Sequence, residues 1–349
     1  MKTHVPPPLT SPGAPQGAPL RALRSLRDRL LLQEDLNFLL TNRVPRIALT
    51  RFMGWFSQIR SPALAALSIR IWRLFTDLDL SEARPRRYAS LHECFTRELV
   101  EGARPVDARE DLLTSPSDGI VGACGPVVDG QLFQAKGFPY RIEELFGPSQ
   151  DTGAFRNGSY VTLRLTSAMY HRFHAPADAT LQHVTYLSGD TWNVNPIALK
   201  RVERLFCRNE RAVLNLRLAR GGHPIALVPV AAILVASLRL HALDVLLHLR
   251  WRGPNEIPAD VPMTKGEELG WFQHGSTIIV FAPPGFALCE GIEPGARVRM
   301  GEPIAVPARL SAEDTEALRQ QLESTLLGMH ADLDRLTGFR DSEPLRAPG

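Results

Sequence analysis

The sequence predicts an α+β fold: N-terminal amphipathic helices, then a β-rich, mainly antiparallel domain, then a C-terminal helix. Three observations predict it. Apolar residues recur at helical spacing before residue 76, short β-branched and aromatic runs separated by Gly, Pro and Asn fill residues 106–307, and a second helical stripe follows Pro307. With 349 residues, of which 44% are apolar and 22% charged, the chain can bury a sizeable core, which excludes a mostly disordered protein.

The N-terminal part divides into a tail and a helical region. Residues 1–19 are rich in Pro, Gly and Ser, so we expect a disordered tail, and they lack the basic start and apolar run of a signal peptide. Residues 20–105 form the expected amphipathic helical region. Ser61 and Pro62 have the pattern of an N-cap followed by proline in the first turn. The two apolar stripes on either side of this pair are Leu49, Phe52, Met53, Phe56 and Ile59, and Leu64, Leu67, Ile71 and Leu74.

Charge is concentrated in this region. Residues 1–75 carry eleven basic and three acidic residues, whereas the remaining 274 carry 29 basic and 34 acidic ones. A basic, apolar segment with Trp55 and Trp72 favours a peripheral site on an anionic membrane, on the cytoplasmic face of the cell membrane. The net charge is only +3, so we expect no nucleic acid as a partner. The alternative is that the helices pack on their own protein. The longest apolar stretch, Ile225 to Leu238, is too short to span a bilayer and contains Pro229.

The β-rich domain is assigned to residues 106–307 and the C-terminal helical extension to residues 308–349. Strands are expected at 160–163, 184–187, 226–235 and 277–281, and they are expected to be antiparallel because helical crossovers of suitable length are scarce. After Pro307, Ser311 and Asp314 resemble a capping box, and leucines continue one helical face as far as Gly338. We interpret this helix as a docking or oligomer-contact element. A second copy of the chain, giving a homo-oligomer, is therefore one candidate partner.

The residue patterns exclude several kinds of site. The four cysteines are far apart, which argues against disulfides or a thiolate zinc site and favours a reducing cytosolic setting. Dinucleotide-binding, Walker, H-E-x-x-H and G-x-S-x-G motifs are absent. His171 and His174 have no further ligand at metal-like spacing, so an acid–base role is favoured and no metal is expected. Asp118, His174 and Ser276 could form a nucleophilic triad, although the sequence alone leaves this one choice among several.

Taken together, the loop motifs resemble those of the phosphatidylserine decarboxylase family, from about Thr41 to Pro307. They occur in the order and spacing typical of that family. They are Cys94 to Leu99, Gly102 to Pro105, Ser115 to Gly119, Gln134 to Gly137, Phe155 to Gly158, Tyr170 to Pro176, Val194 to Pro196, Arg208 to Arg211, Lys265 to Gly270 and Gly275 to Thr277.

The resemblance implies a self-processing, pyruvoyl-dependent enzyme. His174, oriented by Asp118, would activate the Ser276 hydroxyl to attack the Gly275 carbonyl. β-Elimination of the resulting ester would leave a dehydroalanine at the new N-terminus, and its hydrolysis would release ammonia and leave a pyruvoyl group. The products would be a large chain, residues 1–275, and a small chain, residues 276–349. Glycine before the nucleophile has no Cβ to block the attack.

The implied reaction is the conversion of phosphatidylserine to phosphatidylethanolamine and carbon dioxide. A Schiff base between the pyruvoyl group derived from Ser276 and the substrate amine would act as the electron sink. His171 would return a proton to the substrate carbon. A lipid substrate would also account for the basic amphipathic helices at the N-terminus.

The chain departs from the family pattern at a few positions. His274 stands where leucine is usual, Asn193 where some bacterial members have serine, and Ala232 and Ala236 replace expected glycines. These departures bear on the cleavage rate and on the shape of the substrate pocket. Two rival interpretations remain: a Ser-His-Asp lipid esterase with Ser276 intact, and a non-catalytic membrane-associated scaffold.

Overall fold

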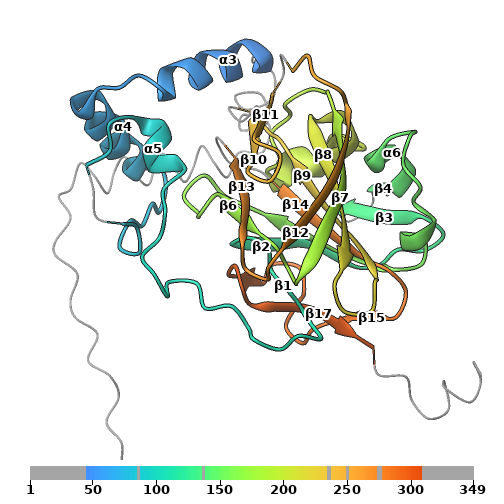
Figure 1. Cartoon of the computed structure of the whole chain (residues 1–349). Helices are drawn as coiled ribbons and strands as arrows, with labels where there is room; N and C mark the ends of the chain where they lie inside the picture. Colours follow the sequence, from blue (N-terminus) through green and yellow to red (C-terminus); the bar gives the residue numbers. More distant parts are fainter. Residues whose placement is uncertain are drawn as a thin grey trace, which may run out of the picture. The chain divides into compact units, whose positions relative to one another are not determined.

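The computed structural model describes residues 45–84, 87–135, 138–233, 237–248, 251–272 and 277–308 (Figure 1). The expected disordered tail at 1–19 and the expected C-terminal helix within 308–349 lie outside these residues, as do Gly275 and Ser276. The described part of residues 45–306 forms one compact unit.

Two helices begin the described chain, and both match the sequence prediction. They are α3 (Arg46–Ser57) and α4 (Pro62–Phe75). The Ser61 hydroxyl accepts a hydrogen bond from Leu64 N at 3.4 Å. Pro62 is the first residue of the helix, a position where a backbone N–H would have no intrahelical acceptor, so proline costs no hydrogen bond there. The shorter helices are α5 (Leu91–Phe95), α6 (Ile142–Phe146), η1 (Gly153–Phe155), α7 (Pro196–Leu199) and α8 (Leu205–Arg208).

An eight-stranded sheet forms the body of the β-rich domain. Its order is β12-β7-β8-β9-β14-β5-β2-β16, and its neighbouring strands pair antiparallel, as predicted. The strands are β2 (Gly119–Pro126), β5 (Ser159–Arg164), β7 (Ala179–Leu187), β8 (Arg211–Leu218), β9 (Pro224–Val230), β12 (Glu256–Met263), β14 (Thr277–Ala282) and β16 (Arg297–Val298). The strand predicted at 226–235 ends earlier, at Val230, beyond which the Asn209 side chain binds the Ala231 carbonyl.

Three smaller sheets complete the domain. The four-stranded sheet has the order β11-β10-β13-β6, the three-stranded sheet β1-β17-β15, and β3 pairs with β4. Their strands are β1 (Leu113–Thr114), β3 (Gln131–Ala135), β4 (Phe138–Arg141), β6 (Arg172–His174), β10 (Ser237–Leu240), β11 (Val245–His248), β13 (Glu268–Phe272), β15 (Phe286–Leu288) and β17 (Pro303–Pro307).

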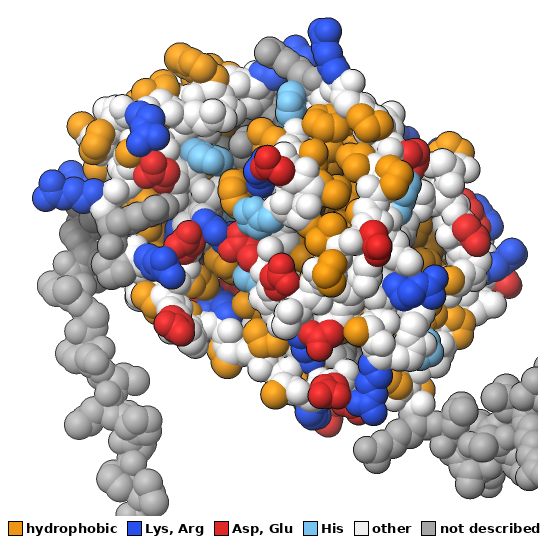
Figure 2. Space-filling view, viewed as in Figure 1, with side chains coloured by type: hydrophobic (Ala, Val, Ile, Leu, Met, Phe, Trp, Pro, Cys, Tyr) orange, Lys and Arg blue, Asp and Glu red, His pale blue; other side chains and the backbone are white. Residues whose placement is uncertain are grey.

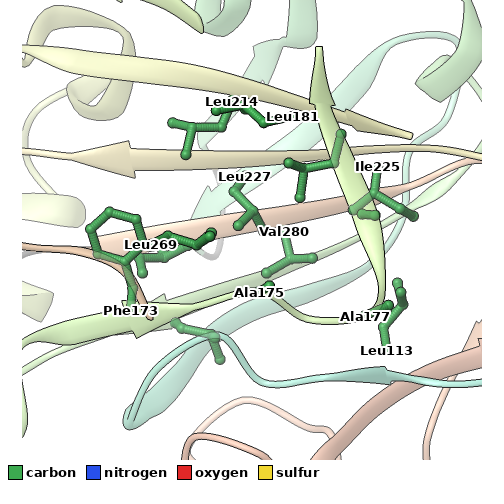
Figure 3. Close-up of a cluster of buried hydrophobic side chains, with 14 of the residues drawn as sticks. Leu113, Phe173, Ala175, Ala177, Leu181, Leu214, Ile225, Leu227, Leu269 and Val280 are labelled. Atoms are coloured by element: carbon green, nitrogen blue, oxygen red, sulfur yellow. The ribbon is translucent and has the colours of Figure 1, made fainter. Parts of the chain in front are cut away.

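Hydrophobic side chains pack on both faces of the large sheet. Because successive strand residues point to opposite faces, Leu163 and Val280 belong to one cluster, whereas Tyr160, Ile279 and Phe281 belong to the other. Figure 3 shows part of the first cluster, in which side chains from several strands converge between the large sheet and the β6–β13 pair. Burial on both faces explains why β14 is a continuous run of apolar residues.

Helices α3, α4 and α5 lie together at one end of the β structure (Figure 1). Arg46 anchors α3 through a two-point ion pair with Asp190, at 3.2 and 2.6 Å, and its guanidinium lies 3.7 Å from the Trp192 ring centre. Trp72 of α4 stacks on Phe95 of α5, with ring centres 5.7 Å apart. Among the described helices, none is long and apolar enough to cross a bilayer.

Candidate active site

The pairing of β6 with β13 places His174 in the interior. His174 is buried and lies opposite Glu268 in the ladder. Its Nδ1 is 2.9 Å from the Gly266 carbonyl oxygen, and its Nε2 is 3.0 Å from the Tyr170 hydroxyl. A carbonyl only accepts, so Nδ1 carries the proton and Nε2 is the basic nitrogen in the neutral ring. Burial lowers the pKa of His174 and therefore favours this neutral form.

His171 precedes the same strand and is fully buried. Its Nδ1 donates to the Met169 carbonyl at 2.8 Å, which again leaves Nε2 as the basic nitrogen of the neutral ring. The imidazole lies against the Phe95 ring, with ring centres 4.0 Å apart. The His171 carbonyl accepts a hydrogen bond from Phe272 N at 3.0 Å. His171 is thus bonded to the last described residue before the predicted cleavage position.

Asp118 ends the turn that leads into β2 and forms a buried ion pair. Arg104 donates to its two carboxylate oxygens at 2.7 and 2.6 Å, and Met300 N donates at 3.0 Å. Within the described residues Asp118 and His174 therefore have separate hydrogen-bond partners. They remain neighbours: His174 N donates to the Pro116 carbonyl at 2.8 Å, and Tyr170 lies within 6.0 Å of the Arg104 guanidinium while contacting the His174 ring.

Gly275, Ser276 and His274 lie outside the described residues, and the nearest described residues are Phe272 and Thr277. Phe272 ends β13 and Thr277 begins β14, and both are buried. Thr277 is paired on one side with Arg164 of β5 and on the other with Val230 of β9. The predicted cleavage position is therefore bracketed by the ends of two strands, one of which is bonded to His171.

A large cavity of about 930 Å³ lies at the end of β5, whose last residue, Arg164, pairs with Thr277 and lines the cavity. Side chains of helices α3, α4 and α5 form an apolar wall of this cavity, and residues of strand ends and loops form a more polar wall. The apolar wall comprises Met53, Phe56, Ile71, Trp72, Leu91 and Phe95, and the polar one includes Arg164, Thr166, Ser167, Asn193 and Asn195. Asn193 and Ala232, two of the departures from the family pattern, both line this cavity. Ala236 lies outside the described residues.

A second, more polar cavity of about 380 Å³ lies on the Asp118 side. Arg97, Arg104, Asp118 and Tyr170 line it, and it shares Thr166 and Ser167 with the large cavity. The segment that joins β5 to the histidines therefore contributes to the walls of both cavities. Among the described residues, no three His, Cys, Asp or Glu side chains are grouped as metal ligands would be.

Sequence reasoning identified the histidines and Asp118 but not their partners. Arg104 and Tyr170 stand within motifs that were recognised, and the Gly266 carbonyl belongs to another. Membership of a motif therefore marks a residue as a candidate for the site. It does not identify the partner of that residue, because the pairing of Arg104 with Asp118 is a contact between separate segments. Arg164 stands outside those motifs and becomes visible only as part of the cavity wall.

Comparison of the sequence with known proteins gives the same family by two routes, a family model and individual relatives. The family model described as phosphatidylserine decarboxylase matches residues 91–306. The chain is 36% identical over 274 residues to the phosphatidylserine decarboxylase proenzyme of Vibrio parahaemolyticus, covering 75% of this chain and 95% of that protein. It is 35% identical to the protein of the same name from Shewanella amazonensis, with the same coverage, and 35% identical to that from Aliivibrio salmonicida, covering 78% of this chain and 99% of that protein.

Proposed function

The chain belongs to the phosphatidylserine decarboxylase family, and we propose that it decarboxylates phosphatidylserine to phosphatidylethanolamine after cleaving itself between Gly275 and Ser276. One observation carries the proposal beyond the family likeness. Two buried histidines, each with Nε2 as its basic nitrogen, flank β6: His171 precedes it and His174 ends it. The one strand paired with β6 among the described residues is β13, which leads toward the cleavage position. A cavity of about 930 Å³ with one apolar wall comes near His171 at Phe95, whose ring lines the cavity and contacts the imidazole.

In self-processing, His174 acts as the base. The Ser276 hydroxyl loses its proton as its oxygen bonds to the Gly275 carbonyl carbon. The peptide C–N bond then breaks, and the departing nitrogen takes a proton from the imidazolium, which leaves an ester. Tyr170 occupies Nε2 of His174, and a hydroxyl can donate one hydrogen bond and accept another, so Tyr170 passes the serine proton to the imidazole. Against the burial that lowers the pKa of His174, the Gly266 carbonyl, Glu268 and then Asp118 act in the opposite direction and favour the protonated imidazole.

The surroundings of the cleavage position fit a pyruvoyl group at the start of the small chain. Thr277 is fully buried between two neighbouring strands, so the residue before it would be carried on a rigid element. When formed, the pyruvoyl group supplies a ketone that condenses with the substrate amine and accepts the electron pair released by the departing carboxylate. His171, protonated on Nε2 for this step, gives a proton to the substrate carbon.

Helices α3 and α4 serve as the contact with the membrane, and the protein is peripheral, on the cytoplasmic face in this proposal. Their buried residues are small or polar (Thr50, Ser57 and Ala65), whereas Phe52, Trp55 and Phe75 are more than half exposed. Hydrophobic side chains are visible on these helices at the upper left of Figure 2. An apolar outer face edged by arginines suits an anionic lipid surface.

Intact-mass measurement of the purified protein tests the proposal. We expect two chains, residues 1–275 and 276–349, with a small chain that has a blocked N-terminus and gains mass on borohydride reduction. Carbon dioxide should be released from phosphatidylserine vesicles, and Ser276→Ala should remain a single, inactive chain. An active chain that stays whole with its serine hydroxyl free would instead support the esterase, and lipid binding without turnover would support the scaffold.

A further inference from the structure

One end of an otherwise apolar sheet face is polar. The residues on this face are Tyr160, Thr162 and Arg164 of β5 and Thr277, Ile279 and Phe281 of β14. Paired residues of antiparallel strands share a face, so Arg164 and Thr277 lie side by side at the end nearest the cleavage position. The apolar cluster thus gives way to an arginine and two threonines at this end.

These polar groups are poorly satisfied by the protein. Among the described residues, the Arg164 guanidinium has no hydrogen-bond or ion-pair partner, and the hydroxyls of Thr162 and Thr277 are buried without one. Burial lowers the pKa of Arg164, yet a guanidinium keeps its charge in proteins. A partly desolvated cation without a carboxylate is destabilising, so such a group commonly marks a binding site.

Arg164 is also the one charged side chain among the described residues that line the 930 Å³ cavity. The opposite wall is formed by apolar side chains of α3, α4 and α5, such as Phe56 and Trp72. A cavity with one cation and an apolar wall matches an amphiphile that has one fixed anionic group. The cation stands next to Thr277, the first described residue after the cleavage position.

We propose that Arg164 binds the phosphodiester of the substrate headgroup and so sets the position of the serine amine at the reaction centre. This inference rests on the proposed function. The phosphodiester is favoured over the substrate carboxylate because the carboxylate loses its charge as carbon dioxide leaves. An arginine bound to the carboxylate would stabilise the ground state over the transition state, whereas one bound to the phosphate keeps its contact throughout the reaction. Guanidinium and phosphate can also form two parallel hydrogen bonds.

The test uses Arg164→Gln in the processed enzyme, with Arg217→Gln as a matched control. Arg217 lies on the exposed side of β8, where it bonds Gln182 and the Gly222 carbonyl. With short-chain phosphatidylserine, we expect kcat/KM of Arg164→Gln to fall about 10- to 100-fold, the usual range for losing a charge-assisted pair. Arg164→Lys should recover part of this loss, and Arg217→Gln should match the wild type.

Product inhibition identifies the anion. Short-chain phosphatidylethanolamine keeps the phosphodiester but lacks the carboxylate, so Arg164→Gln should weaken its inhibition as much as it weakens substrate use. Unchanged inhibition with impaired substrate use would assign Arg164 to the carboxylate, and no change in either would overturn the inference. A wild type that releases no carbon dioxide would refute the proposed function instead. If Arg164→Gln fails to process, binding of the same product analogue to Ser276→Ala, with and without Arg164→Gln, gives the same comparison.

Discussion

The β body and the helices α3 and α4 use the same kinds of side chain in opposite ways. In the body, Phe281 is fully buried and contacts the rings of Phe146, Phe155 and Tyr160. In the helices, Phe52 and Trp55 are 53% and 64% exposed while Thr50 faces inward. Aromatic residues therefore stabilise the fold in the β body, whereas in helices α3 and α4 they are exposed and can contact a membrane surface. Changes in the body should alter chemistry or stability, and changes at the exposed aromatic residues of the helices should alter attachment.

The two histidines of the body should give the largest effects, and different ones. His174→Ala removes the base for self-cleavage, so the chain should remain whole and inactive. His171→Ala should still yield two chains, because its ring is not needed for cleavage, but decarboxylation should fall about 10²- to 10⁴-fold with the loss of the proton donor. Intact-mass spectrometry measures cleavage, and carbon dioxide release measures turnover. Equal loss of cleavage in both variants would contradict the division of roles.

Phe281→Ala should cost about 3–5 kcal/mol in the free energy of unfolding, since it leaves a cavity among three aromatic rings. The measurement is denaturant unfolding in a Ser276→Ala background, which keeps the protein as one chain. Phe52→Ala is the control: as an exposed residue, it should change the free energy by no more than about 0.5 kcal/mol. Similar costs at the two positions would remove the contrast between body and helices.

Glu210 should make the stability of the body depend on pH. Its carboxyl is buried 2.6 Å from the Tyr186 hydroxyl, and burial raises its pKa to about 7 from an ordinary 4.5. The folded state keeps a proton that the unfolded state releases, so this contribution is complete below pH 4.5 and is lost as pH rises through about 7.

The loss amounts to about 3 kcal/mol. In the Ser276→Ala background, unfolding measured from pH 4.5 to 8 should show this decline. Glu210→Gln should abolish it, whereas the exposed Glu110→Gln should keep it. A parallel decline in all three proteins would rule out Glu210 as its source.

Changes on the exposed face of the helices, away from the cavity wall, should affect membrane attachment only. The double variant Phe52→Ser and Trp55→Ser should reduce binding to anionic vesicles about 10- to 100-fold, because each side chain loses part of its apolar transfer free energy. Val128→Ser with Phe133→Ser is the matched control, since these residues are similarly exposed (59% and 52%) but lie away from the helices. Sedimentation with vesicles measures binding. An equal loss in the control would indicate a general hydrophobic effect.

Local pattern predicted much of this structure. The Ser61–Pro62 helix start and the antiparallel strands follow from short-range signals in the sequence, whereas the burial of His174 depends on the pairing of β6 with the distant strand β13. Other features depend on contacts between distant segments. Helical spacing identified the apolar stripe of α3 but could not show that Thr50 faces inward, because that depends on which surface the helix meets. The Asp118–Arg104 pair is likewise a tertiary contact.

The central place of β14 has a consequence for how the protein can be assembled. This strand lies between β9 and β5, and cleavage at Gly275 would assign it to the small chain while both neighbours stay in the large one. Before cleavage, unfolding and refolding involve one molecule. Afterwards refolding requires two chains to meet, so stability becomes dependent on concentration and the association entropy must be overcome. Folding therefore has to precede cleavage, and a denatured mature enzyme should not recover by the route that first formed it.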